Sequence, residues 1–336
     1  MKVRIPSFVF YSAAFLILIM MIMLFSSSFL GNNNTFFNTA QAHTATIPVG
    51  MAPHGIKYDR TNNNIYVANA ASSTVSVISG STNSVIATTL VGSIPVWLVH
   101  VPSDNKIYVT NEESNDVYVI NAATNKVIKA IAVGSQPFGI DYDPTNNSVY
   151  VTNLASNTVS VINAAKDVVV SSIPLGTVAG NTSPILLGYA NDNDALYVSK
   201  HPQEVSVINA VTNAVVNHMG VDGDPDGIAY NPTNHNIYVA KQSSSQVAVI
   251  NTITNSVVAN IPVGLSPFDI VYNPVNHNMY VTNSNSDTVS VINSATNSVI
   301  DTIPAGRTPT GITYDTSNNH IYVANLGPGT VTMIHP

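Results

Sequence analysis

Cysteine is absent from the 336-residue sequence, and charged residues make up only 9% of it. Without cysteine, a disulfide framework, a thiol nucleophile, a haem-attachment motif and a thiolate metal site are all excluded, so packing must stabilise the fold. The helix formers Glu, Lys and Leu are scarce after residue 50. Acidic residues outnumber basic ones by 18 to 11, which argues against a nucleic-acid partner, because phosphates need a basic surface.

The residues that are abundant point to β-structure. Hydrophobic residues make up 45% of the chain, and Asn, Thr, Ser and Val recur throughout it. This composition is typical of short strands joined by polar turns.

The N-terminus has the features of an export segment. Lys2 and Arg4 precede an apolar run over residues 8–25, and a polar run follows. Ala40-Gln41-Ala42 offers a small-x-small cleavage site before His43. We therefore expect residues 1–42 to be a signal peptide or, if uncleaved, a membrane anchor that contacts the bilayer only through residues 8–25. Residues 43–336 would lie outside the cell or at its surface.

One tetrapeptide recurs seven times, at intervals of 42, 42, 47, 41, 42 and 42 residues. This period matches the four-stranded blade of a β-propeller. The copies begin at Tyr66, Tyr108, Tyr150, Tyr197, Tyr238, Tyr280 and Tyr322.

Each period contains four short strands separated by turn residues. In the third copy we expect strands over 138–142, 148–152, 158–162 and 168–173. The last copy has only three strands, while Thr46-Ile47-Pro48-Val49-Gly50 stands unpaired before the first copy. The sequence therefore predicts an all-β, seven-bladed propeller of four-stranded antiparallel blades, closed by the N-terminal strand completing the last blade.

From His43 onward, the chain resembles the YVTN family of β-propeller repeat proteins and surface-layer-type exported propellers. The resemblance is carried by the YVTN tetrapeptides and by the T-V-S-V-I strands at Val75, Val159 and Val289. It implies an exported repeat protein with a binding role.

Because strands alternate in direction, the links between blades and the links from second to third strands share one face, which we call the top. It receives the residues that follow the linking prolines and should form the mouth of the central channel. These residues are His54, Val96, Phe138, Ile185, Asp226, Phe268 and Thr310. It also receives the last residue of each tetrapeptide, Asn in five copies but Lys200 and Lys241 in blades four and five.

Departures from the repeat mark candidate functional residues, and most lie in blades four and five. Thr177 to Asn181 is an insertion, and Lys200, His201 and Lys241 could bind an anionic ligand or pair with nearby aspartates. Phe138 and Phe268, with Trp97, could stack on a sugar or aromatic ligand, or could only pack. His54 is the histidine best placed for function.

Asp222-Gly223-Asp224-Pro225-Asp226-Gly227 has the spacing of a calcium loop, although Thr233 stands where the bidentate Glu of an EF-hand would be. The sequence leaves open whether Asp222, Asp224 and Asp226 bind Ca²⁺ or form a solvated acidic loop, and it implies no other cofactor.

The sequence also contains glycosylation sequons and a set of histidines in turns. Asn146 and Asn181 begin glycosylation sequons. His235, His277 and His320 fall in equivalent turns on the opposite, bottom face, a blade apart, and read as solvated turn residues rather than metal ligands.

No catalytic motif stands out, so the sequence favours a non-enzymatic binding module whose partner is an envelope or extracellular protein, a glycan or a small ligand. The alternative is a metal-assisted lyase or lactonase-like enzyme, which would require His54, Asp226 and Asp269 to converge at the channel mouth.

Overall fold

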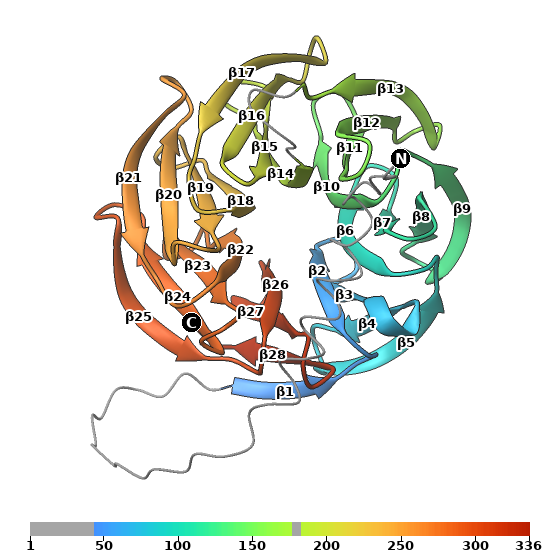
Figure 1. Ribbon diagram of the computed structural model, residues 1–336. Helices are drawn as coiled ribbons and strands as arrows, with labels where there is room; N and C mark the ends of the chain where they lie inside the picture. The colour runs from blue at the N-terminus through green and yellow to red at the C-terminus, as the bar shows by residue number, and fades with distance from the viewer. Residues whose placement is uncertain (1–43, 177–182) are drawn as a thin grey trace, which may run out of the picture. The chain divides into compact units, whose positions relative to one another are not determined.

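The computed structural model describes residues 44–176 and 183–336, and their strands form seven four-stranded antiparallel sheets. The sheets are arranged as blades around a central axis (Figure 1). The chain is therefore a seven-bladed β-propeller, as the repeat predicts. The N-terminal segment, the proposed cleavage site and the insertion at 177–181 lie outside the described residues. Within the described residues, no helix is long and apolar enough to span a bilayer.

Each blade runs outward from the axis, and strands at the same position in different blades have nearly the same length. The innermost strands are β2 (Pro53–Asp59), β6 (Pro95–Val101), β10 (Pro137–Asp143), β14 (Ser183–Ala190), β18 (Pro225–Asn231), β22 (Pro267–Tyr272) and β26 (Pro309–Asp315). The second strands are β3 (Asn64–Asn69), β7 (Lys106–Asn111), β11 (Ser148–Asn153), β15 (Ala195–His201), β19 (Asn236–Lys241), β23 (Asn278–Asn283) and β27 (His320–Asn325).

The third strands are β4 (Thr74–Ser79), β8 (Asp116–Asn121), β12 (Thr158–Asn163), β16 (Glu204–Asn209), β20 (Gln246–Asn251), β24 (Thr288–Asn293) and β28 (Thr330–Ile334). The outermost strands are β5 (Ser84–Leu90), β9 (Lys126–Ala132), β13 (Val168–Pro174), β17 (Ala214–Gly220), β21 (Ser256–Pro262), β25 (Ser298–Pro304) and, in blade seven, β1 (Thr44–Pro48). One short 3-10 helix, η1 (Ala70–Ser72), follows β3.

The ring is closed by β1, as expected from the unpaired N-terminal segment. It runs antiparallel to β28, with Ala45 opposite Met333 and Ile47 opposite Val331. The last blade therefore joins residues from both ends of the described chain, and Ile47 is buried. Closure leaves no blade with a missing strand.

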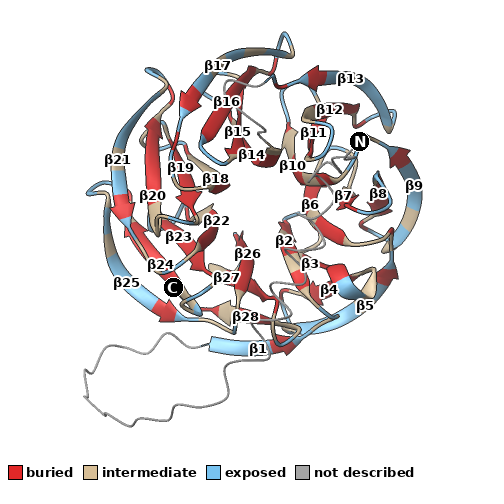
Figure 2. Cartoon of the chain, in the orientation of Figure 1, coloured by how far each residue is buried: buried red, intermediate tan, exposed pale blue. Residues whose placement is uncertain are grey.

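The core lies between neighbouring blades. The second and third strands are almost entirely buried, whereas the outermost strands are largely exposed (Figure 2). Alternating Val and Ile side chains from adjacent blades pack together in seven clusters. This explains why β-branched residues dominate the repeat.

The tyrosine that begins each tetrapeptide joins one blade to the next. The Tyr238 hydroxyl, for example, donates hydrogen bonds to the Ser294 carbonyl and to Asn297 Oδ1 in blade six. In the sixth blade, the Tyr280 hydroxyl instead accepts a hydrogen bond from Asn276 of its own blade. A buried hydroxyl with satisfied partners at the blade boundary is thus a structural feature of the repeat.

Candidate functional site at the mouth of the channel

Four rings from four blades meet at the top of the central axis, and we call them the aromatic cluster: His54, Trp97, Phe138 and Phe268. The His54 ring lies 5.3 Å from Trp97, 5.6 Å from Phe138 and 5.4 Å from Phe268, each in an edge-on arrangement. Phe268 is buried, whereas the other three are partly exposed. The cluster therefore presents an apolar, aromatic surface that solvent reaches.

Close approach of the inner strands makes this cluster possible. A Cβ atom added to Gly55 would lie 2.6 Å from the Val96 carbonyl oxygen and 2.9 Å from the Trp97 Cα. Glycine at this slot lets the neighbouring strand come within contact distance. In blade two, Trp97 occupies the slot itself, and its side chain lies against Gly55.

His54 is a neutral ring at physiological pH. Burial lowers its pKa from 6.5 to about 4, and the hydrogen bond to the backbone of Val96 offsets this only in part. Its Nδ1 atom is buried without a hydrogen-bond partner. The ring therefore acts as an aromatic contact rather than as a charge.

A histidine–aspartate pair lies on the same face. His201, at the end of β15, approaches Asp226, at the start of β18, with 2.8 Å between Nε2 and Oδ1. The Asp226 side chain is 2% exposed and that of His201 32%. The second carboxylate oxygen of Asp226, Oδ2, is buried and has no partner. Asp226 holds one nitrogen of the imidazole and leaves the ring accessible at the mouth.

The electrostatics of this pair favour retention of a proton. Burial would lower the pKa of His201, but its hydrogen bond to Asp226 and the charges of Asp226 and Asp224 outweigh burial and raise it. Burial also raises the pKa of Asp226, and the contacts with His201 offset this only partly. The pair therefore holds a proton more firmly than a solvated histidine does.

Further charged groups line the inner strands. Asp269 accepts hydrogen bonds from the backbone N–H groups of Ile270 and of Ile312 in the next blade. Burial raises its pKa to about 7 despite these bonds and the charge of Lys57. The enzymatic alternative requires His54, Asp226 and Asp269 to converge, and the structure meets this requirement in part. The charge of Asp226 raises the pKa of Asp269. The His54 ring contacts Phe268, the residue before Asp269.

Both lysines form ion pairs within the protein. Lys200 is fully buried and donates to Glu204 Oε1 and to the Gly176 carbonyl oxygen, both at 3.0 Å. Lys241 is 1% exposed and donates to Asp222 at 2.8 Å. Of the two alternatives drawn from the sequence, pairing with an aspartate describes Lys241, whereas Lys200 pairs with a glutamate of its own blade. Binding of an anionic ligand by these residues stays a prediction.

The aspartates of the proposed calcium loop point to different partners. Asp222 pairs with Lys241 and Asp226 with His201. No group of three or more His, Asp or Glu side chains suited to a metal occurs among the residues that the structure describes. The D-x-D-x-D-G spacing therefore does not gather Asp222, Asp224 and Asp226 around one point.

Glu112 is a buried acidic residue that was not predicted from the sequence. It directly follows the tetrapeptide of blade two, the same position that His201 occupies in blade four, so both belong to the top loops around the mouth. Glu112 is 7% exposed, and burial, aided by the charge of Glu113, raises its pKa to about 7. A comparison of this position among the seven copies would have revealed both residues.

Of the two proposed glycosylation sites, Asn181 lies outside the described residues. The amide nitrogen of Asn146 donates to the Tyr150 hydroxyl at 3.1 Å and to the Ala210 carbonyl at 3.2 Å. A glycan on this nitrogen would have to disrupt a contact between blades.

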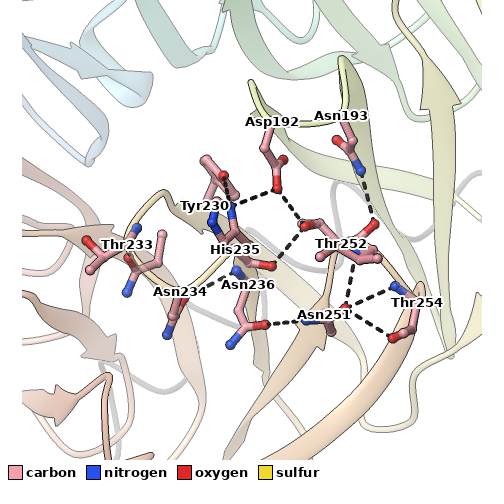
Figure 3. A network of polar contacts seen from close by, with 12 residues as sticks. Asp192, Asn193, Tyr230, Thr233, Asn234, His235, Asn236, Asn251, Thr252 and Thr254 are labelled. Atoms are coloured by element: carbon pink, nitrogen blue, oxygen red, sulfur yellow. Dashed lines mark hydrogen bonds and ion pairs between the residues drawn. The ribbon is translucent and has the colours of Figure 1, made fainter.

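The bottom-face histidines take part in polar networks with their neighbours. Figure 3 shows His235 beside Asp192, whose Oδ2 lies 3.2 Å from His235 Nδ1 and 2.8 Å from Thr252 Oγ1. His277 lies 2.7 Å from the Tyr272 hydroxyl. These contacts agree with a role in the turns.

Comparison with solved structures finds seven-bladed propellers that align with most of the chain. Hydrazine synthase of Kuenenia stuttgartiensis aligns with a TM-score of 0.77 at 19% identity, covering 90% of this chain and 99% of that one. A streptogramin B lyase aligns with a TM-score of 0.75 at 13% identity, over 87% and 97% of the two chains. A catalytically inactive histidine-to-alanine variant of virginiamycin B lyase from Staphylococcus aureus, solved with quinupristin, aligns with a TM-score of 0.76 at 14% identity, over 88% and 100%. No protein-family model and no curated protein matches the sequence.

These neighbours correct one prediction. The lack of a catalytic motif predicts that the chain is not an enzyme, yet the solved structures that share its fold over nearly their whole length include enzymes. In a propeller the reactive groups come from separate blades, so a short motif is not needed for a catalytic site. At these identities the likeness establishes the fold alone.

Proposed function

We propose that the mouth of the channel binds an uncharged, ring-containing small molecule and that His201 transfers a proton to and from it. The observation that carries this proposal is the buried His201–Asp226 pair, with its unpartnered carboxylate oxygen, on the same face as the aromatic cluster. Buried titratable pairs beside an apolar surface are typical of catalytic sites.

The chemistry of the site argues for the ligand class. Trp97, Phe138 and His54 offer partly exposed rings on which a sugar or an aromatic ring can stack. Lys200 and Lys241 are paired with Glu204 and Asp222, so the acidic groups around the mouth would repel an anionic ligand. A neutral glycan or another neutral cyclic compound suits this surface.

The reaction class that we propose is elimination, as in the lyases that share the fold. His201 would take a proton from a substrate carbon, and the C–H electron pair would form the new double bond as the bond to the leaving group breaks. Glu112, whose pKa of about 7 keeps it partly protonated, would give its proton to the leaving group. Solvent would then restore both groups.

We further propose that the protein is an exported, YVTN-type propeller that acts outside the cytoplasm. The support is the apolar run over residues 8–25 followed by a small-x-small site, and the tetrapeptide repeat itself. An extracellular propeller with this site would act on ligands from the surroundings of the cell.

The test uses the fluorescence of Trp97, the single tryptophan of the chain. Quinupristin and a neutral phenyl glycoside are titrated into the full-length protein, and mass spectrometry then follows turnover. An elimination product lacks the added water that hydrolysis would leave. Asp226→Asn should lower kcat by about 100-fold or more while the fluorescence change on binding persists. Asp224→Asn, in the same loop, is the control: it removes a charge that also raises the pKa of His201 but keeps the hydrogen bond between Asp226 and the His201 ring, so kcat should fall much less.

Two results would contradict the proposal. If neither probe changes Trp97 fluorescence, the mouth is not a site for this ligand class. If turnover occurs but Asp226→Asn and Asp224→Asn behave alike, the proton transfer belongs to other residues.

A further inference from the structure

Blade seven carries two histidines side by side at its bottom edge, far from the channel mouth. Ile321 of β27 pairs with Ile334 of β28, so the next residues outward, His320 and His335, are cross-strand neighbours. Their side chains therefore extend from the same face of the sheet. The spacing of 15 residues conceals this relation in the sequence.

The two imidazole rings lie close to each other. The ring centroids lie 5.1 Å apart, with an angle of 59° between the planes. His320 Nδ1 is buried without a hydrogen-bond partner, and His335 is exposed. We propose that His320 and His335 together bind a divalent transition-metal ion such as Cu²⁺, Ni²⁺ or Zn²⁺, with water completing the coordination.

The donors suit such an ion. Neutral imidazole is a preferred ligand of Cu²⁺, Ni²⁺ and Zn²⁺. Asp315, opposite His320 in β26, adds a negative charge nearby. Its Oδ1 accepts from the Ser317 backbone N–H and hydroxyl, and no group of three metal-ligating side chains forms among the described residues, so Asp315 assists through its charge rather than as a ligand.

The pair is specific to blade seven. In the equivalent row of the other blades, the partners are Asn64 and Ser79, Lys106 and Asn121, Ser148 and Asn163, Ala195 and Asn209, Asn236 and Asn251, and Asn278 and Asn293. In those blades the second member begins the turn toward the outermost strand. In blade seven β1 supplies that strand, so no turn follows β28 and position 335 can carry a side chain with another role.

The experiment titrates Cu²⁺ into the full-length protein, because Cu²⁺ binds nitrogen sites most tightly among these ions. Electron paramagnetic resonance counts the coordinated nitrogens, and calorimetry gives the affinity. We expect one site with two nitrogen ligands and an affinity that falls at least about tenfold in His320→Ala and in His335→Ala.

The matched control is His277→Ala, which removes a bottom-face histidine already bonded to Tyr272. It should leave the affinity unchanged, and the metal-free melting temperature of each variant should show that the blade is intact. Equal loss of affinity in His277→Ala, a spectrum with one nitrogen, or unchanged binding in both His320→Ala and His335→Ala would overturn the proposal.

Discussion

Acidifying the protein should quench the fluorescence of Trp97 in a transition centred near pH 4. The His54 ring lies 5.3 Å from the Trp97 ring, and burial lowers the pKa of His54 to about 4. A protonated imidazole quenches a neighbouring indole, whereas a neutral one quenches much less. Because the chain contains a single tryptophan, the signal comes from this site alone.

The same shift makes a prediction about stability. The folded protein binds a proton at His54 less readily than the unfolded chain does. The free energy of unfolding is therefore unaffected by His54 above pH 6.5 and decreases as the pH falls toward 4. The shift from 6.5 to about 4 corresponds to about 3 kcal/mol at most, reduced by the solvent that reaches part of the ring. Urea unfolding at a series of pH values measures this loss.

The variant His54→Gln separates this effect from general acid unfolding. It should remove the fluorescence transition and flatten the decline in stability between pH 6.5 and 4, while far-ultraviolet circular dichroism shows that the wild-type fold persists through the transition. A midpoint near pH 6.5 in the wild type would refute the reasoning, because it would mean that His54 is well solvated.

Three further outcomes follow from the packing of the blades. Gly227→Ala should destabilise the fold by about 1–3 kcal/mol, since its Cβ would lie 2.5 Å from a backbone oxygen, whereas Gly220→Ala meets nothing within 4 Å and should be nearly neutral in urea unfolding. Tyr238→Phe should cost about 1–3 kcal/mol by leaving buried acceptors unpaired across the blade boundary, and Tyr280→Phe should cost less in the same assay. Asp269→Asn should become more stable relative to the wild type as the pH rises from 5 to 8, because Asp269 loses its proton more readily in the unfolded chain than in the fold, where its pKa is about 7. A constant difference in the free energy of unfolding would contradict this.

The fold could be predicted from the sequence because each level of the repeat agrees with the others. Alternating apolar residues, turn residues and a period near 42 all specify the same four strands. The expected strand over 148–152 and the observed β11, Ser148–Asn153, begin at the same residue. Even closure followed from local evidence, since an unpaired strand at one end matched a missing one at the other.

The site was harder to predict because its contacts join different blades. The repeat placed His54, Phe138 and Phe268 on one face, but it could not show that their rings meet. It likewise could not show that Lys200 and Lys241 turn inward. A side chain's partner in the next blade is about 20 to 60 residues away, and nothing in its own period specifies it.

Asp226 and Lys241 illustrate why an unusual residue at a repeat position has two possible meanings. Lys241 stands where most blades have Asn, and the structure balances its charge at once with Asp222 of the same region. Asp226 stands where three other blades have the rings of His54, Phe138 and Phe268, and its partner His201 satisfies only one of its two oxygens. An unusual residue whose polar atoms all find partners preserves the structure of the repeat. One with a buried polar atom that lacks a partner lowers stability, unless that atom binds a ligand. By this criterion Asp226, rather than Lys241, is the departure that supports the proposed ligand site.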